Sequence, residues 1–169
     1  MLLEPATVVA KAWEHIAAIG RRTFWDARTV LVVGAGPIGL LAALIGVQQG
    51  ADLHVLDRVT DGPKPALVGQ LGAAYHTGTV AGLGLSPHIV VECTGVAELV
   101  RQAMETVSPG GIICLTGVGS SAAPGTVPAT TLATDVVLKN IAVFGLGERQ
   151  PAVLLPRGEG ARRGGPVMA

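Results

Sequence analysis

The stretch Thr29–Leu41, T-V-L-V-V-G-A-G-P-I-G-L-L, decides the fold of this 169-residue chain. It opens with a β-branched run typical of a buried strand, passes through a glycine-rich turn, and continues into residues typical of a helix. Its glycines fall at the spacing G-x-G-x-x-G. This order of elements predicts a binding site for the phosphates of NAD, NADP or FAD.

Each glycine of the turn has its own expected role. Gly34 allows the tight turn from strand to helix, Gly36 lets the backbone approach a pyrophosphate, and Gly39 lets the helix pack closely on the strand. The free N–H groups at the start of the helix then face the phosphates. We therefore expect cofactor contacts from Gly34, Gly36, Pro37, Ile38, Gly39 and Leu40.

Short apolar runs alternate with helical segments along most of the chain. Strands are expected at 30–33, 53–56, 74–76, 89–93, 112–116 and 141–144, and helices at 5–19, 37–49, 63–71, 96–107 and 129–139. Strands that are continuously apolar indicate a parallel sheet buried on both faces. The predicted fold class is therefore α/β, a doubly wound parallel sheet of the Rossmann type in three layers, α/β/α.

The chain divides into three expected parts. Residues 1–28 hold a leading helix and a polar connection, and residues 29–145 form the dinucleotide-binding domain. Residues 146–169 have no period and are interrupted by glycine and proline, so no regular structure is expected there.

Composition excludes several classes of function. The formal net charge is zero and aromatic residues make up 3% of the chain, so neither nucleic acid nor an anionic membrane is an expected partner. The longest apolar run, 37–47, is too short to span a bilayer, and no secretion signal is recognisable. Cys93 and Cys114 lie in apolar runs without closely spaced ligands, which predicts buried thiols and no metal site. A cytoplasmic protein is expected.

The residues at the end of the second expected strand indicate which dinucleotide can bind. Asp57 lies about 20 positions beyond the glycine turn, where a carboxylate can accept hydrogen bonds from the adenosine ribose and repel a 2′-phosphate, which favours NAD. Arg58 can stack on adenine or pair with a 2′-phosphate. The residues therefore leave NAD and NADP open.

Two later turns follow strands on the same side of the expected sheet. Open α/β sheets bind ligands beyond the carboxyl ends of their strands. Further cofactor contacts are therefore expected from Thr94, Gly95 and Val96 and from Gly117, Val118 and Gly119.

Several segments together resemble glucose 1-dehydrogenases of the zinc-dependent medium-chain dehydrogenase superfamily. They are L-E-P-A-T-V-V-A-K-A-W-E-H-I, V-V-G-A-G-P-I-G-L-L-A-A-L, V-L-D-R-V-T-D-G-P-K-P, V-E-C-T-G and V-L-K-N-I-A-V-F-G. The resemblance implies oxidation of glucose or a related aldose at C1 with NAD or NADP. It also implies a catalytic zinc in an N-terminal domain that has no counterpart in this chain, so no catalytic or metal residue is assigned and the chain alone is expected to be inactive.

The resemblance ends near Gly145. The family continues with a segment resembling S-V-N-A-N-R-R, whereas this chain reads L-G-E-R-Q-P-A. A single-base frame shift at Leu146 would account for the difference. Without the family's ending, the sheet edge through which relatives pair would be exposed, so self-association and low solubility are expected.

Three alternatives remain at this stage. A stand-alone module that binds or senses NAD(H) without catalysis would use the same turn. The glycine turn also resembles FAD-binding openings, although their second strand usually ends in Glu. S-adenosylmethionine enzymes combine a glycine turn with an acidic strand end, but V-E-C-T-G fits them poorly.

Overall fold

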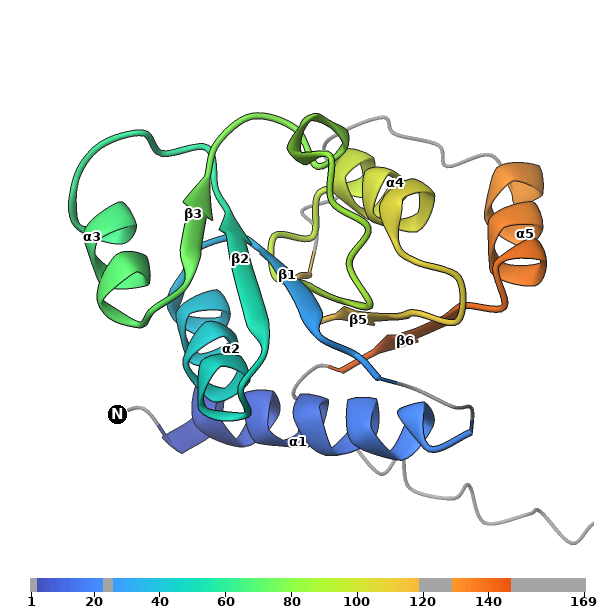
Figure 1. Cartoon of the computed structure of the whole chain (residues 1–169), viewed down its shortest axis with the longest axis horizontal. Helices are drawn as coiled ribbons and strands as arrows, with labels where there is room; N and C mark the ends of the chain where they lie inside the picture. Colours follow the sequence, from blue (N-terminus) through green and yellow to red (C-terminus); the bar gives the residue numbers. More distant parts are fainter. Residues whose placement is uncertain (1–2, 23–25, 119–128, 147–169) are drawn as a thin grey trace, which may run out of the picture.

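A computed structural model of the chain describes residues 3–22, 26–118 and 129–146. Its centre is a six-stranded parallel sheet with the strand order β3-β2-β1-β4-β5-β6 (Figure 1). The strands are β1 (Thr29–Val33), β2 (Asp52–Leu56), β3 (Ala74–His76), β4 (Ile89–Glu92), β5 (Ile112–Leu115) and β6 (Ala142–Gly145). The order reverses between β1 and β4, which is where sheets of this kind bind ligands.

Five α-helices connect and cover the strands. They are α1 (Leu3–Gly20), α2 (Pro37–Gln48), α3 (Pro63–Gln70), α4 (Ala97–Thr106) and α5 (Ala129–Leu138), with a short 3₁₀ turn at Ala81–Leu83. The predicted elements and the doubly wound fold are confirmed, with boundaries that differ by one or two residues. No helix of the described ranges is long and apolar enough to cross a membrane.

The two faces of the sheet bury two separate hydrophobic clusters. Val30 and Val32 of β1 point toward α1 and α2, whereas Leu31 and Val33 point toward α4 and α5. This alternation follows from the two-residue period of a strand. In Figure 1, α1 and α2 lie below the sheet and α4 and α5 lie above it, giving the three layers that the sequence predicts.

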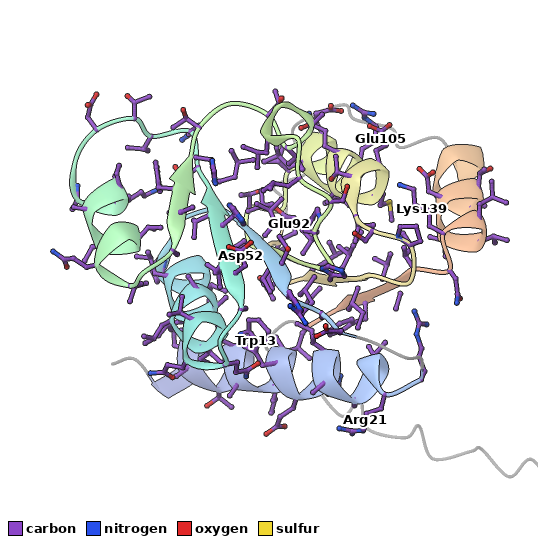
Figure 2. The ribbon with its side chains drawn as sticks, viewed as in Figure 1. Trp13, Arg21, Asp52, Glu92, Glu105 and Lys139 are labelled. Carbon is purple, nitrogen blue, oxygen red and sulfur yellow. The ribbon has the colours of Figure 1, made fainter. Side chains whose placement is uncertain are left out.

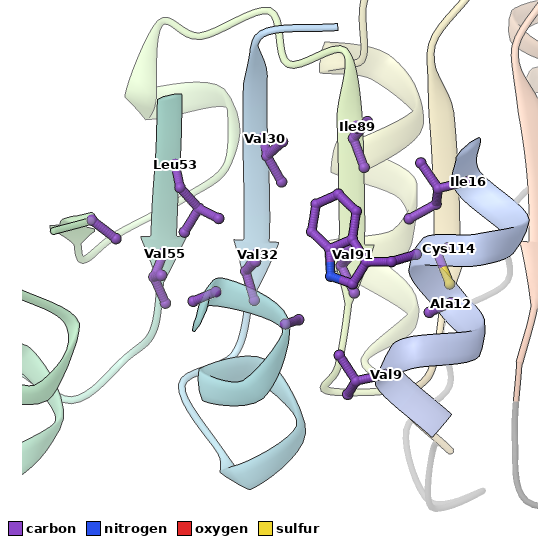
Figure 3. Packing of buried hydrophobic residues seen from close by; sticks show 14 of the residues in the cluster. Val9, Ala12, Ile16, Val30, Val32, Leu53, Val55, Ile89, Val91 and Cys114 are labelled. Atoms are coloured by element: carbon purple, nitrogen blue, oxygen red, sulfur yellow. The ribbon is translucent and has the colours of Figure 1, made fainter. Parts of the chain in front are cut away.

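The leading helix belongs to the core of the molecule. Val9, Ala12 and Ile16 of α1 are buried against β1, β4 and β5 (Figure 3). Trp13 is buried in the same hydrophobic cluster. The indole of Trp13 also reaches Gly46 of α2, where an added Cβ would lie 3.0 Å from the ring. Residues 3–20 and the sheet therefore form one packed unit.

Candidate functional site

A cavity of about 420 Å³ opens at the carboxyl ends of β1, β2 and β4. Five of the predicted cofactor residues line it, namely Gly34, Asp57, Arg58, Thr94 and Val96. The remaining lining residues are Val33, Leu56, Lys64, Gly78 and Leu99. The structure thus brings the ends of three separate strands together at the reversal of strand order.

The glycine turn has the shape expected of a phosphate cradle. Gly34 has φ of +102°, and a Cβ there would lie 2.8 Å from the Thr94 methyl group. A Cβ on Gly39 would lie 1.8 Å from the carbonyl oxygen of Gly34, so close packing of helix on strand requires glycine at both positions.

Gly36 differs from its two neighbours. Its backbone is extended, with φ −82° and ψ −177°, and a Cβ there would meet no atom within 4 Å. The fold therefore does not require glycine at this position. An open space beside the N-terminus of α2, free of any Cβ, fits the diphosphate of a dinucleotide.

The residues of the first turn of α2 contribute to two surfaces, the candidate site and an apolar groove. Gly36 is the N-cap and Pro37 the first helical residue. Pro37 and Leu40 line an apolar groove between α2 and α3, and the Ile38 and Leu40 side chains pack against the core. These residues can therefore serve a phosphate only through the backbone at the helix N-terminus.

Asp57 is already engaged within the protein. Oδ2 accepts a hydrogen bond from the Ala35 N–H at 2.6 Å and from Lys64 Nζ at 2.9 Å, and Oδ1 accepts one from the Val59 N–H at 3.0 Å. Burial raises the pKa of this carboxyl, but the hydrogen bonds and the Lys64 charge outweigh burial and hold the pKa below its ordinary value. The carboxylate therefore links the glycine turn to the segment that follows β2.

Lys64 is a site residue that sequence reasoning missed. It forms an ion pair with Asp57 and lines the same cavity. Its place in the first turn of α3 was a usable signal, because a cation is disfavoured at the positive end of a helix dipole unless it has an anionic partner.

Glu92, the last residue of β4, is a second missed residue. Its side chain is fully buried near the centre of the molecule (Figure 2). Its carboxylate accepts hydrogen bonds from the N–H groups of Thr94 and Gly95 and from the Thr94 hydroxyl. Glu92 therefore holds the turn that presents Thr94 and Val96 to the cavity.

The last predicted turn follows β5. A Cβ on Gly117 would lie 2.1 Å from the Gly95 nitrogen, so glycine allows the two turns to touch. Val118 is 90% exposed and does not line the cavity. Gly119 lies outside the described residues.

Both cysteine side chains lie at least partly inside the protein. Cys114 is fully buried, as predicted, whereas Cys93 is only partly buried and accepts a hydrogen bond from the Thr116 hydroxyl. Burial raises the pKa of the Cys93 thiol to about 11 and that of Cys114 to about 12. Within the described ranges, no three His, Cys, Asp or Glu side chains form a group that could hold a metal ion.

The whole described part of the chain is similar in sequence to known proteins. Residues 1–149 match the family model described as the glucose dehydrogenase C-terminus. The chain is 34% identical over 152 residues to a glucose 1-dehydrogenase of Methanocella arvoryzae and 36% identical over 151 residues to one of Thermoproteus tenax, covering 86% of this chain each time. It spans only 42% of the length of these two curated relatives.

Solved structures agree with the sequence comparison. The glucose dehydrogenase of Haloferax mediterranei superposes with a TM-score of 0.77 at 28% identity, covering 89% of this chain and 45% of that one. A second structure of that enzyme, in complex with NADP, zinc and gluconolactone, superposes with a TM-score of 0.76 at 28% identity, covering 86% of this chain and 43% of that one.

Proposed function

Because the chain belongs to the glucose dehydrogenase C-terminal family, we propose that it is the nicotinamide-dinucleotide-binding domain of a glucose 1-dehydrogenase. The observation that carries the proposal is the open space at Gly36, beside a helix N-terminus and next to the cavity at the strand reversal. A diphosphate fits such a place because it is anionic and needs close backbone approach.

The residues of the site have distinct proposed roles. Gly34 and Gly39 shape the turn, and the backbone from Gly36 to Leu40 holds the diphosphate. Asp57 and Arg58 serve the adenosine half of the dinucleotide. The turns after β4 and β5 contact it from the neighbouring strand ends through Thr94, Gly95, Val96, Gly117, Val118 and Gly119.

In the intact enzyme the bound nicotinamide accepts a hydride from C1 of glucose or a related aldose. The residues of this chain bind and orient the dinucleotide. We assign the catalytic zinc and most of the sugar contacts to the N-terminal domain of the intact protein, so this chain alone binds the cofactor without turning over sugar. The intact enzyme is proposed to act in the cytoplasm.

The substitution Gly36→Ala tests the assignment. Its methyl group enters the open space without touching the protein. We expect the melting temperature to stay the same while NADH affinity falls at least about tenfold, the equivalent of one lost hydrogen bond. Affinity is measured by NADH fluorescence titration and stability by circular dichroism.

Gly69→Ala is the matched control, because a Cβ at Gly69 on α3 also meets no atom within 4 Å but lies away from the cavity. It should leave NADH affinity unchanged. A chain that binds neither NADH nor NADPH at millimolar concentration, or a Gly36→Ala variant that binds as tightly as the parent, would overturn the proposal.

An activity assay separates the two functional alternatives. Adding the zinc domain of a related glucose dehydrogenase as a separate chain should restore oxidation of glucose with the dinucleotide if this chain is half of an enzyme. Dinucleotide binding without any restored oxidation would favour a stand-alone binding or sensing module.

Residues 146–169 carry a separate proposal. All but Leu146 lie outside the described residues, and the proposal that this tail is read out of frame rests on its sequence alone. The coding DNA decides it: a single-base change at Leu146 should restore a string resembling the family's S-V-N-A-N-R-R, and failure to do so rejects the proposal.

A further inference from the structure

Two histidines near one edge of the sheet share a hydrogen bond. Ala74 of β3 pairs with His54 of β2, so His76, two residues further on, lies on the same face as His54. His54 Nδ1 is 2.8 Å from His76 Nε2, and the ring centroids are 5.1 Å apart. This bond requires that one of the two facing nitrogens carries a proton and that the other does not.

Asp52 extends this pair into a line of three polar side chains. Its Oδ2 lies 3.4 Å from His54 Nε2, which makes no hydrogen bond within the described ranges but is close enough for electrostatic attraction. A cationic His54 would therefore face a carboxylate on one side and still donate its Nδ1–H to His76 on the other. The pair can hold one positive charge without losing its hydrogen bond.

A second positive charge breaks the arrangement. With both rings charged, each facing nitrogen carries a proton, so the hydrogen bond is lost and two cations lie side by side. Burial and the neighbouring His54 ring accordingly lower the pKa of His76 from its ordinary value. The two rings therefore titrate as a coupled pair.

The elements packed against β2 and β3 supply no anion that would offset a second charge. They are β1 and α2, which hold no titratable side chain, and α3, whose one titratable residue, Lys64, is paired with Asp57. Tyr75 is the other titratable side chain of β3, and the segment between β3 and β4 holds only His88, whose Nδ1 faces the Thr29 N–H. Asp52 is therefore the carboxylate that faces the pair.

The strand β3 holds the first residues after β2. The carbonyl of His76 accepts the Asp57 N–H at 3.1 Å, and the Tyr75 hydroxyl donates to the Val59 carbonyl at 2.5 Å. Asp57 lines the cavity of the candidate site, as does Gly78, two residues beyond His76. The position of β3 therefore decides where this wall of the cavity lies.

Attachment of β3 to the sheet is limited. It has three residues, lies at the end of the strand order and pairs with β2 alone among the described strands (Figure 1). Few backbone hydrogen bonds therefore oppose its displacement, as expected of a region of low local stability.

From these contacts we propose, on the premise of the function given above, that the His54–His76 pair positions residues 57–59 at the cavity in a proton-dependent way. With at most one positive charge on the pair, β3 stays bonded to β2 and holds the segment. With two, repulsion displaces β3 and releases the segment. His76 and Tyr75 are positioning residues, because neither lines the cavity and each acts through the segment it holds.

Acid therefore weakens binding of the dinucleotide. The pKa of His76 is lower in the folded chain than in a free histidine, so release of β3 takes up a proton. Affinity should be constant above about pH 7 and fall as the pH drops below about 6.5, the ordinary pKa of histidine. One proton limits the fall to about tenfold per pH unit, and the fall ends below the lowered pKa of His76.

ADP-ribose is a suitable probe of this effect. It contains the adenosine and the diphosphate of the dinucleotide but no phosphate monoester, so its own charge does not change in this pH range. Titration calorimetry on the full chain should show affinity about threefold to tenfold lower at about pH 5.5 than at about pH 8. Binding in acid should also release protons, which two buffers with different heats of ionisation reveal.

Amide side chains replace the pair without titrating. In His54→Asn/His76→Gln, the amide of Asn takes the place of Nδ1 and the amide of Gln the place of Nε2, so a hydrogen bond can form at any pH. The loss of affinity in acid and the proton release should both disappear. His76→Gln alone should have the same effect if the double variant is destabilised, because a cationic His54 still donates to the amide oxygen.

Tyr75→Phe separates positioning from proton dependence. It removes the hydroxyl that bonds to the Val59 carbonyl and leaves the histidine pair intact. Affinity for ADP-ribose should fall by about threefold to tenfold at every pH, as for one lost hydrogen bond, while the pH dependence stays the same.

His15→Gln is the matched control. His15 is exposed on α1 and stacks on Phe144 of β6, at the other end of the strand order, with 5.8 Å between the ring centroids. Its removal should leave the pH dependence of ADP-ribose binding unchanged. Circular dichroism checks that the parent chain and each variant are folded at every pH.

The outcomes separate this proposal from the dinucleotide-binding function. If ADP-ribose binds equally tightly at both pH values, or if the loss in acid persists in His54→Asn/His76→Gln, only the role of the histidine pair is overturned. If ADP-ribose does not bind at about pH 8, the binding function fails, and NMR of the ring protons in the free chain still tests the pair. His54 and His76 should titrate in two steps more than about one pH unit apart, and two independent titrations near the ordinary pKa of histidine would overturn the proposal.

Discussion

At the scale of single residues, the carboxylates of Asp57 and Glu92, at the ends of β2 and β4, hold backbone turns in place. Asp57 accepts the Ala35 N–H of the glycine turn, and Glu92 accepts the N–H groups of the turn that follows it. Each therefore fixes one wall of the cavity by pairing backbone donors that would otherwise be buried without partners.

Glu92 gives the residue-scale prediction. Glu92→Gln keeps the shape of the side chain, but its amide group donates hydrogen bonds where the backbone also donates. We expect the free energy of unfolding to fall by about 2–3 kcal/mol, because the hydrogen bonds lost are to a buried charged group. Urea denaturation measures the change.

Glu98→Gln on α4 is the control, because Glu98 is exposed and pairs with Arg101 at the surface. Its free energy of unfolding should stay close to that of the parent chain, because solvent screens an exposed ion pair. Equal stability losses for the two variants would show that Glu92 does not support the turn.

At the scale of secondary structure, the contact between α1 and α2 depends on one small residue. Gly46 lies in the last turn of α2, and glycine is a poor helix former. An added Cβ would lie 2.4 Å from Leu53 Cδ1 and 3.0 Å from the Trp13 ring. The close approach of α2 to α1 and β2 therefore requires glycine at this position.

Gly46→Ala should accordingly destabilise the chain in spite of its better helix propensity. The propensity gain is about 1 kcal/mol, and we expect overpacking to exceed it for a net loss of about 1–2 kcal/mol. Gly69→Ala makes the same change where the Cβ meets no atom, and it should not destabilise. Thermal melts compare the two; a melting temperature for Gly46→Ala above that of the parent would contradict the packing account.

At the scale of the whole molecule, the last strand leaves an edge. β6 ends the strand order and pairs with β5 alone among the described strands. Beside it, Val137 and Leu138 at the end of α5 are 74% and 79% exposed. An open strand edge next to exposed apolar side chains favours association between copies.

We therefore propose that copies of this chain associate through β6 and the end of α5, and that its solubility is low. The double substitution Val137→Lys/Leu138→Lys should weaken association at least about tenfold, because it places charge beside the edge. Light scattering over a concentration series measures association. Leu67→Lys on α3, which is 43% exposed at the other end of the sheet, is the control. A parent chain that stays monomeric and monodisperse over the series and melts cooperatively would reject the proposal.

The sequence by itself determined the fold. The period-two and helical patterns are local, and they place the six strands and five α-helices of the described residues within one or two residues. The short 3₁₀ turn at Ala81–Leu83 was not predicted. The need for glycine at positions 34 and 39 could also be predicted from the sequence, because few backbone conformations allow a tight turn from strand to helix.

Only the tertiary structure decided how the charges of the site are paired. Asp57 and Lys64 are seven residues apart in the sequence. Their ion pair could not be predicted from that spacing, because it depends on how the loop between β2 and α3 brings the ammonium beside the carboxylate. Likewise, burial of Glu92 among backbone donors depends on how the turn after β4 closes. Such pairings arise from loops whose geometry is set by distant packing, so Asp57, which by sequence alone favours NAD, becomes in the folded chain part of a neutralised pair.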